Sequence, residues 1–211
     1  MLGADVMDNE IRHAVFIEPE DGILDAVLEW KSRIAVRWPE AAYLKHPAHG
    51  TIWCGKVKSG SSPPRDLAER IAALKRFRLP VIGPYVFFND GLAGGQTLAY
   101  RLALTDSLSA LQQTVCGSIL HHTRCQETKC LPDALRQEPF ETSWTDYGFP
   151  FVGAHWIPHF TVASLPVAQD DPIVTEFMSD VCLLEMQIHH VSWWQISGEA
   201  HDRLARFPLA L

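Results

Sequence analysis

The sequence predicts an α+β fold made of two similar lobes that face each other across a cleft. Two observations lead to this prediction. A histidine, any residue, a threonine and an apolar residue occur in that order at 49–52 and again at 159–162, so that the two histidines stand 110 positions apart. Each copy is also surrounded by the same expected order of elements, namely strand, helix, motif strand, helix and strand. A repeated order of this kind is typical of an internal duplication.

The first half of the chain supplies one set of these elements. The apolar run at 14–17 ends at Glu18-Pro19 and is typical of a buried strand. Asp21 can cap a helix, and Trp38-Pro39 ends it. The loop at 59–64 is rich in serine, glycine and proline and separates two further elements. The expected elements are a strand at 14–17, helix at 23–36, strand at 49–58, helix at 67–77 and strand at 81–88.

The second half repeats this order with an extra segment. We expect one domain of 1–211, with pseudo-repeats at about 13–90 and 97–197 and an irregular insertion at about 121–156 before the second motif. Asp106 or Ser107 can cap the first helix of this half. The expected elements are a strand at 97–105, helix at 107–119, motif strand from 159, helix at 172–184 and closing strand at 185–196.

Composition narrows the class of protein. The 211 residues are 47% hydrophobic and 20% charged, as in an ordinary globular domain. The net charge of −7 argues against an extended nucleic-acid surface, because such a surface must neutralise many phosphates. No apolar run reaches the roughly 18 residues of a membrane span. Five cysteines without a disulfide framework, and no signal-like segment at 1–10, indicate a cytoplasmic protein.

The motif residues would share a face of their strands. Side chains alternate along a strand, so His49 and Thr51 point one way and Gly50 and Ile52 the other. Trp53 would follow Thr51 on the same face, where it either stacks on a ring of the substrate or forms a wall of the core. His159 and Thr161 repeat the arrangement. A third triplet, at 121–123, lacks this strand-like alternation.

These residues resemble the 2H phosphoesterase superfamily, which includes the LigT-like or 2′-5′ RNA ligase-like proteins. The likeness rests on the two motifs, on Pro158 and on the closing strand at 191–196. It implies two antiparallel sheets facing a central cleft with helices outside. It also implies catalytic roles for His49, Thr51, His159 and Thr161 without metal or cofactor. Gly50 and the Cys/His-rich segment at 116–130 depart from the family pattern.

The residue types suit reactions at a phosphate. Histidine takes or gives a proton near neutral pH, and phosphodiester cleavage needs both acts. Threonine hydroxyls can donate hydrogen bonds to phosphate oxygens. We therefore expect a phosphoesterase that opens a 2′,3′-cyclic nucleotide-like phosphate or cleaves a 2′-5′ phosphodiester on a small nucleotide or RNA end. Trp53, Tyr43 and Trp156, in or near the motifs, are the candidate substrate-binding residues.

Two other functions remain open from the sequence. The first is a non-catalytic nucleotide- or RNA-binding module on the same fold, although binding alone does not require two proton carriers. The second is a structural zinc protein that uses the cysteines and histidines of 116–130. Their spacing fits no paired zinc pattern, and we therefore expect no metal site.

Overall fold

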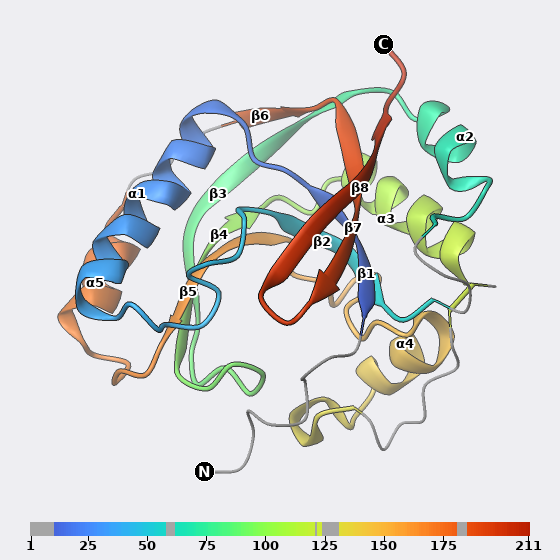
Figure 1. Cartoon of the computed structure of the whole chain (residues 1–211). Coiled ribbons are helices and arrows are strands. Elements are labelled where there is room, and N and C mark those ends of the chain that lie inside the picture. Colours follow the sequence, from blue (N-terminus) through green and yellow to red (C-terminus); the bar gives the residue numbers. More distant parts are fainter. Residues whose placement is uncertain (1–10, 58–61, 121, 124–130, 181–184) are drawn as a thin grey trace.

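A curved antiparallel sheet forms the centre of the fold (Figure 1). The computed structural model describes residues 11–57, 62–120, 122–123, 131–180 and 185–211. Within these ranges, eight strands lie in the order β6-β3-β4-β5-β2-β1-β7-β8. The strands are β1 (Arg12–Ile17), β2 (Gly50–Gly55), β3 (Phe77–Phe87), β4 (Gln96–Leu102), β5 (His159–Leu165), β6 (Glu185–Ile188), β7 (His190–Ser197) and β8 (Ala200–Pro208).

The sheet divides into two groups of strands at its middle. Only the pair Gly50–Phe160 joins β2 to β5, whereas the other neighbouring strands pair over several residues. We call β6-β3-β4-β5 the His159 lobe and β2-β1-β7-β8 the His49 lobe. The α+β class and the antiparallel sheets predicted from the sequence are confirmed.

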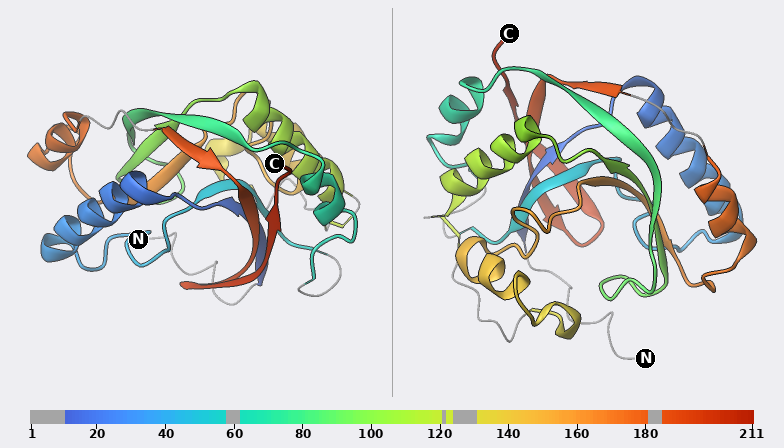
Figure 2. Two further views of the ribbon diagram at one scale, coloured as in Figure 1. Left: turned by 90° about the horizontal axis from the view of Figure 1, so that it is seen from above. Right: turned by 180° about the vertical axis from the view of Figure 1, so that it is seen from behind.

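Helices cover the sheet from outside. They are α1 (Asp21–Arg37), α2 (Leu67–Ala72), α3 (Asp106–Ile119), α4 (Phe140–Tyr147) and α5 (Pro172–Met178), with a short 3-10 helix, η2, at Asp133–Leu135. In Figure 2, α1 and α5 lie beside the His159 lobe, and α2 and α3 lie beside the His49 lobe. The main core fills the space between these helices and the sheet. No helix of the described residues is long and apolar enough to span a membrane.

Several predicted boundaries change in the structure. The helix expected at 67–77 ends at Ala72, and Phe77 instead begins β3. The closing strand expected at 185–196 is broken at His189 into β6 and β7, because β6 pairs with β3 and β7 pairs with β1. The strand β8 and the helix α4 were not predicted. Most side chains of β8 are exposed, so its sequence carries little hydrophobic pattern.

Both motif strands contain the same irregularity one residue after the threonine. Thr51 pairs with Phe16 but Trp53 pairs with Val15, so Ile52 is the extra residue of a β-bulge. Thr161 pairs with Ala99 but Ala163 pairs with Leu98, so Val162 is the extra residue of a second bulge. After each bulge the alternation of faces is shifted by one residue. This shift decides which later side chains can reach the motif face.

Candidate active site

The two motifs meet where the lobes join. Gly50 pairs with Phe160 in antiparallel register. Continued by one residue in each direction, this register sets Thr51 opposite His159 and His49 opposite Thr161. All four motif side chains are partly exposed, whereas the alternating residues Gly50, Ile52, Phe160 and Val162 are buried. The two imidazoles are thus diagonal neighbours on one face. In regular antiparallel strands the Cα atoms of such diagonal neighbours lie about 7–8 Å apart.

Glycine at position 50 is required by this close meeting of strands. A Cβ atom at Gly50 would lie 2.8 Å from Cγ1 of Ile17 and 3.2 Å from Cε1 of Phe160. Those side chains already fill the space behind the motif. The departure from the family pattern at this position is therefore explained by packing.

Both motif histidines are held in the same way. Nδ1 of His49 lies 2.7 Å from the carbonyl oxygen of Pro47, and Nδ1 of His159 lies 2.7 Å from that of Ile157. A carbonyl can only accept, so each Nδ1 carries the hydrogen and each neutral ring presents a bare Nε2. The His49 ring also stacks on Phe16, with centroids 3.8 Å apart. The His159 ring lies 4.8 Å from that of Phe87.

The surroundings favour the neutral form of both rings. Burial lowers the pKa of His49 to about 3. The hydrogen bond to Pro47 opposes this shift, and the nearby His201, His46 and Lys31 add to it. Burial also lowers the pKa of His159, against smaller opposing effects of the Ile157 carbonyl and Asp90. A neutral imidazole with a bare Nε2 is the form that accepts a proton.

A cation and two aromatic rings stand beside His159. Arg101 on β4 is directly opposite His159 and is exposed. Its guanidinium lies 5.4 Å from the ring of Tyr85, and Tyr85 in turn lies 4.9 Å from Phe87. Within the described part of the chain, no carboxylate forms an ion pair with Arg101. This group was not predicted from the sequence, because strand pairing is what brings it to the motif.

The three predicted substrate-binding residues differ in their exposure to solvent. Trp53 is completely buried, and its indole donates a hydrogen bond to the Tyr147 carbonyl at 2.8 Å. The bulge at Ile52 turns it into the core, so of the two alternatives for Trp53 the wall of the core is confirmed and contact with the substrate is wrong. Trp156, only 6% exposed, belongs to the same core and is also wrongly predicted. Tyr43 is partly exposed, and its ring lies 5.4 Å from that of His46. It remains a candidate.

No metal-binding cluster occurs among the described residues, where no three His, Cys, Asp or Glu side chains converge. Cys125, Cys130 and His121 of the Cys/His-rich segment lie outside those residues, and Cys116 is buried. Two hollows of about 420 and 350 Å³ lie away from the motifs, one beside Arg78 and His189, the other beside Pro64 and His122. Neither contains a motif residue, and we assign the site from the paired proton carriers instead.

A buried lysine organises the loop in front of His49. Lys31 of α1 is 7% exposed, and its ammonium donates to the carbonyls of Tyr43, Leu44 and His46 at 2.6, 3.2 and 2.9 Å. Burial lowers the pKa of this ammonium to about 8. The next residue of the loop, Pro47, supplies the carbonyl that holds His49. Lys31 therefore holds the loop whose next residue contacts His49, and we expect it to position His49 through that loop.

Replacing Lys31 by methionine should leave three carbonyls without their donor. We expect the free energy of unfolding to fall by about 2–4 kcal/mol, and kcat/KM on a cyclic phosphate to fall by about 10²-fold because His49 loses its placement. Thermal unfolding and steady-state kinetics measure the two effects. Lys45→Met is the matched control, since that exposed side chain on the same loop pairs only with Glu40 and Glu199 within the described residues. Equal losses in both variants would contradict the assigned role.

Comparisons with known proteins place the fold. No protein-family model and no curated protein sequence matches the chain. Among solved structures, TT0787 of Thermus thermophilus matches with a TM-score of 0.62 and 14% identity, over 93% of this chain and 97% of that one. E. coli LigT in its apo form matches with a TM-score of 0.54 and 11% identity, over 97% of this chain and 100% of that one. LigT complexed with 3′-AMP matches with a TM-score of 0.53 and 12% identity, over the same shares of the two chains. The chain thus has the fold of TT0787 and LigT, which is the 2H phosphoesterase fold.

Proposed function

We propose that this protein is a phosphoesterase that opens a 2′,3′-cyclic nucleotide-like phosphate or cleaves a 2′-5′ phosphodiester. The observation that carries the proposal is the antiparallel meeting of the two motifs around Gly50 and Phe160. It gives two imidazoles with bare Nε2 atoms on one face, each opposite the threonine of the other motif. A binding module would not need this pairing of proton carriers.

The proposed reaction uses the two histidines in turn. One Nε2 takes a proton from water while the water oxygen forms a bond to phosphorus. The bond from phosphorus to the 2′ or 3′ oxygen breaks, and the other histidine, in its protonated form, gives its proton to that oxygen. The hydroxyls of Thr51 and Thr161 donate to the non-bridging oxygens, where negative charge gathers in the transition state. Arg101 adds a cation beside His159.

The ligands of a structural neighbour agree with this substrate class. LigT has been solved with 3′-AMP and, at a TM-score of 0.51 to this chain, with NADP+. Both are small nucleotides with a phosphate on a ribose hydroxyl. A small nucleotide or an RNA end is therefore the substrate class that we propose for this chain.

The proposal is tested by turnover of a short panel of substrates. We expect hydrolysis of a 2′,3′-cyclic mononucleotide, of ADP-ribose cyclic phosphate or of a 2′-5′ linked oligonucleotide, with phosphorus NMR identifying the hydroxyl that is released. Activity should survive excess EDTA, because both proton transfers are assigned to side chains. Loss of turnover with the chelator and its return with a divalent ion would indicate metal-assisted chemistry. Tight nucleotide binding without turnover would favour the binding module.

The pH dependence should reflect the lowered pKa values of both histidines. The profile of kcat/KM reports the free protein and requires one neutral and one charged ring, so it should be a bell. Because both pKa values are lowered, we expect its maximum below the ordinary histidine pKa of about 6.5. The kcat profile should lie at higher pH, since a bound phosphate stabilises an imidazolium. The two limbs of the bell report pKa values of the histidine pair and are not assigned to single residues. A kcat/KM maximum above pH 8 would contradict this account.

A further inference from the structure

A third histidine reaches the motif face from a strand that was not predicted from the sequence. We propose that His201 contacts the substrate beside His49 and binds a second anionic group, the phosphodiester that joins the reacting nucleotide to the rest of an RNA end. This inference rests on the proposed function and makes it more specific. The substrate would then be an oligonucleotide terminus in preference to a mononucleotide.

Strand register places His201 on the motif side of the sheet. His201 pairs with Ile196 across the β7–β8 hairpin. Ile196 and Trp194 pack with Ala14 and Phe16 in a small cluster separate from the main core. Phe16 in this cluster is the residue on which His49 stacks. His201 therefore lies on the face that carries His49.

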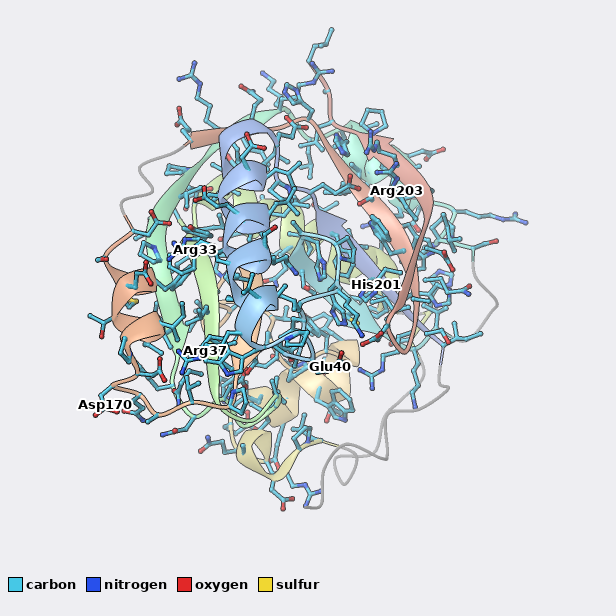
Figure 3. The ribbon with its side chains drawn as sticks, turned by 60° about the vertical axis from the view of Figure 1, so that its left-hand side comes forward. Arg33, Arg37, Glu40, Asp170, His201 and Arg203 are labelled. Carbon is cyan, nitrogen blue, oxygen red and sulfur yellow. The ribbon has the colours of Figure 1, made fainter. Side chains whose placement is uncertain are left out.

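Ring distances agree with this placement. The His201 ring centroid lies 5.8 Å from that of His49 and 4.4 Å from that of His46. His201 is thus a near neighbour of His49, with 5.8 Å between the two ring centroids. It is close enough to contact the next group of the same substrate. Figure 3 shows His201 on β8 near the loop that contains Glu40.

The ring of His201 is oriented like those of the two motif histidines. Nδ1 of His201 lies 3.0 Å from the carbonyl oxygen of Glu199, again two residues upstream. The hydrogen is thereby fixed on Nδ1 of the neutral ring, and Nε2 is directed elsewhere. The side chain is only partly exposed. Within the described part of the chain, no side chain or carbonyl is hydrogen-bonded to its Nε2.

Most charged side chains on β8 and on the loop before His49 form ion pairs, whereas Lys31 forms none in the part of the chain that the structure describes. Lys31 lies behind His46, and its hydrogen bonds within the described residues go to carbonyls instead of carboxylates. Glu199 and Glu40 both pair with Lys45. On β8, Arg203 and Arg206 share the single carboxylate of Glu18. Lys31 thus has no carboxylate partner among the described residues, and a phosphodiester beside His46 and His201 would supply an opposite charge to which protonated His201 donates.

The test compares two substrates that share a reacting group. One is a 2′,3′-cyclic mononucleotide, and the other is a dinucleotide that ends in the same cyclic phosphate. Wild-type protein should prefer the dinucleotide. His201→Ala should lower kcat/KM for the dinucleotide about 10–100-fold more than for the mononucleotide, mainly through KM. His201→Gln, which keeps a donor, should recover part of this difference. The matched control is Asp202→Ala, on the same strand but the opposite face, and it should not change the ratio.

The two kinds of failure are distinguishable. If the wild-type protein turns over both substrates and His201→Ala lowers both equally or neither, the role of His201 is overturned while the proposed function stands. If the wild-type protein turns over neither, the proposed function fails. In that case, the binding of an anion to His201 is tested by titration with inorganic phosphate, which is monitored through the NMR signals of the imidazole Cε1–H groups. A shift of the His201 signal, assigned through His201→Gln, supports anion binding there, and an unchanged signal overturns it.

Discussion

Replacing His49 or His159 by alanine is expected to lower kcat/KM on a cyclic phosphate by about 10²–10⁴-fold. Each change removes one of the two proton carriers, and both rings are partly exposed, so the fold should survive the substitution. Each ring also presents its Nε2 through the same hydrogen bond to a carbonyl two residues upstream. The two losses should therefore be similar. Steady-state kinetics at several pH values measures them.

Three controls separate catalysis from folding. Thermal unfolding of the two variants should stay within a few degrees of wild type, although His49→Ala also loses the stacking on Phe16. The double variant should be little worse than either single one, because residues that act as a unit are not additive. His121→Ala, from the third triplet and outside the described residues, should keep its turnover. An inactive His121 variant beside an active His49 variant would show that the wrong triplet was chosen.

Strand periodicity predicted the motif face correctly only up to the threonine. His49 and Thr51, like His159 and Thr161, precede the irregularity of their strand, and all four are partly exposed. Trp53 follows a bulge and is buried instead. The sequence does contain a trace of the bulge, because in both motifs the threonine is followed by two consecutive apolar residues, and all four are buried. A continuous apolar run, however, is equally typical of a strand that is buried on both faces.

Other parts of the site depend on pairing between distant segments. Arg101 and His159 become neighbours only through the register of β4 and β5. His201 approaches His49 only because β8 folds back on β7 and β7 pairs with β1. These contacts carry no local pattern, since they join residues far apart in the sequence. Such residues can be recognised as exposed polar positions from the sequence, but their neighbours cannot.

The internal duplication stays a prediction. Each lobe combines strands from both halves of the chain, since β1 and β2 join β7 and β8 while β3 and β4 join β5 and β6. The two motif strands nevertheless share a bulge after the threonine and a carbonyl that holds the histidine. Each histidine ring also lies against a phenylalanine ring of its own lobe, His49 against Phe16 and His159 against Phe87. A duplication followed by exchange of strands between the lobes would explain these shared features.

Replacing Thr51 or Thr161 by valine should lower kcat/KM by about 10–10³-fold with little change in KM. Valine keeps the shape of threonine but cannot donate to a phosphate oxygen. The register sets Thr51 opposite His159 and Thr161 opposite His49, so we expect each hydroxyl to donate to the phosphate beside the histidine of the other motif. Because both side chains are partly exposed, neither substitution leaves a buried polar group without a hydrogen-bond partner. The melting temperature should therefore change little.

The matched control for these variants is Thr123→Val. This threonine is buried, donates to the Leu120 carbonyl at 3.1 Å and belongs to the third triplet, so its loss should affect stability more than turnover. The combination of Thr51→Val with His159→Ala is the sharpest measurement. If the hydroxyl and the opposite imidazole act on one phosphate, their effects should be less than additive, whereas unrelated sites would add within about 0.5 kcal/mol. Full additivity, or unchanged kcat/KM in both threonine variants, would mean that the hydroxyls do not contact the reacting phosphate.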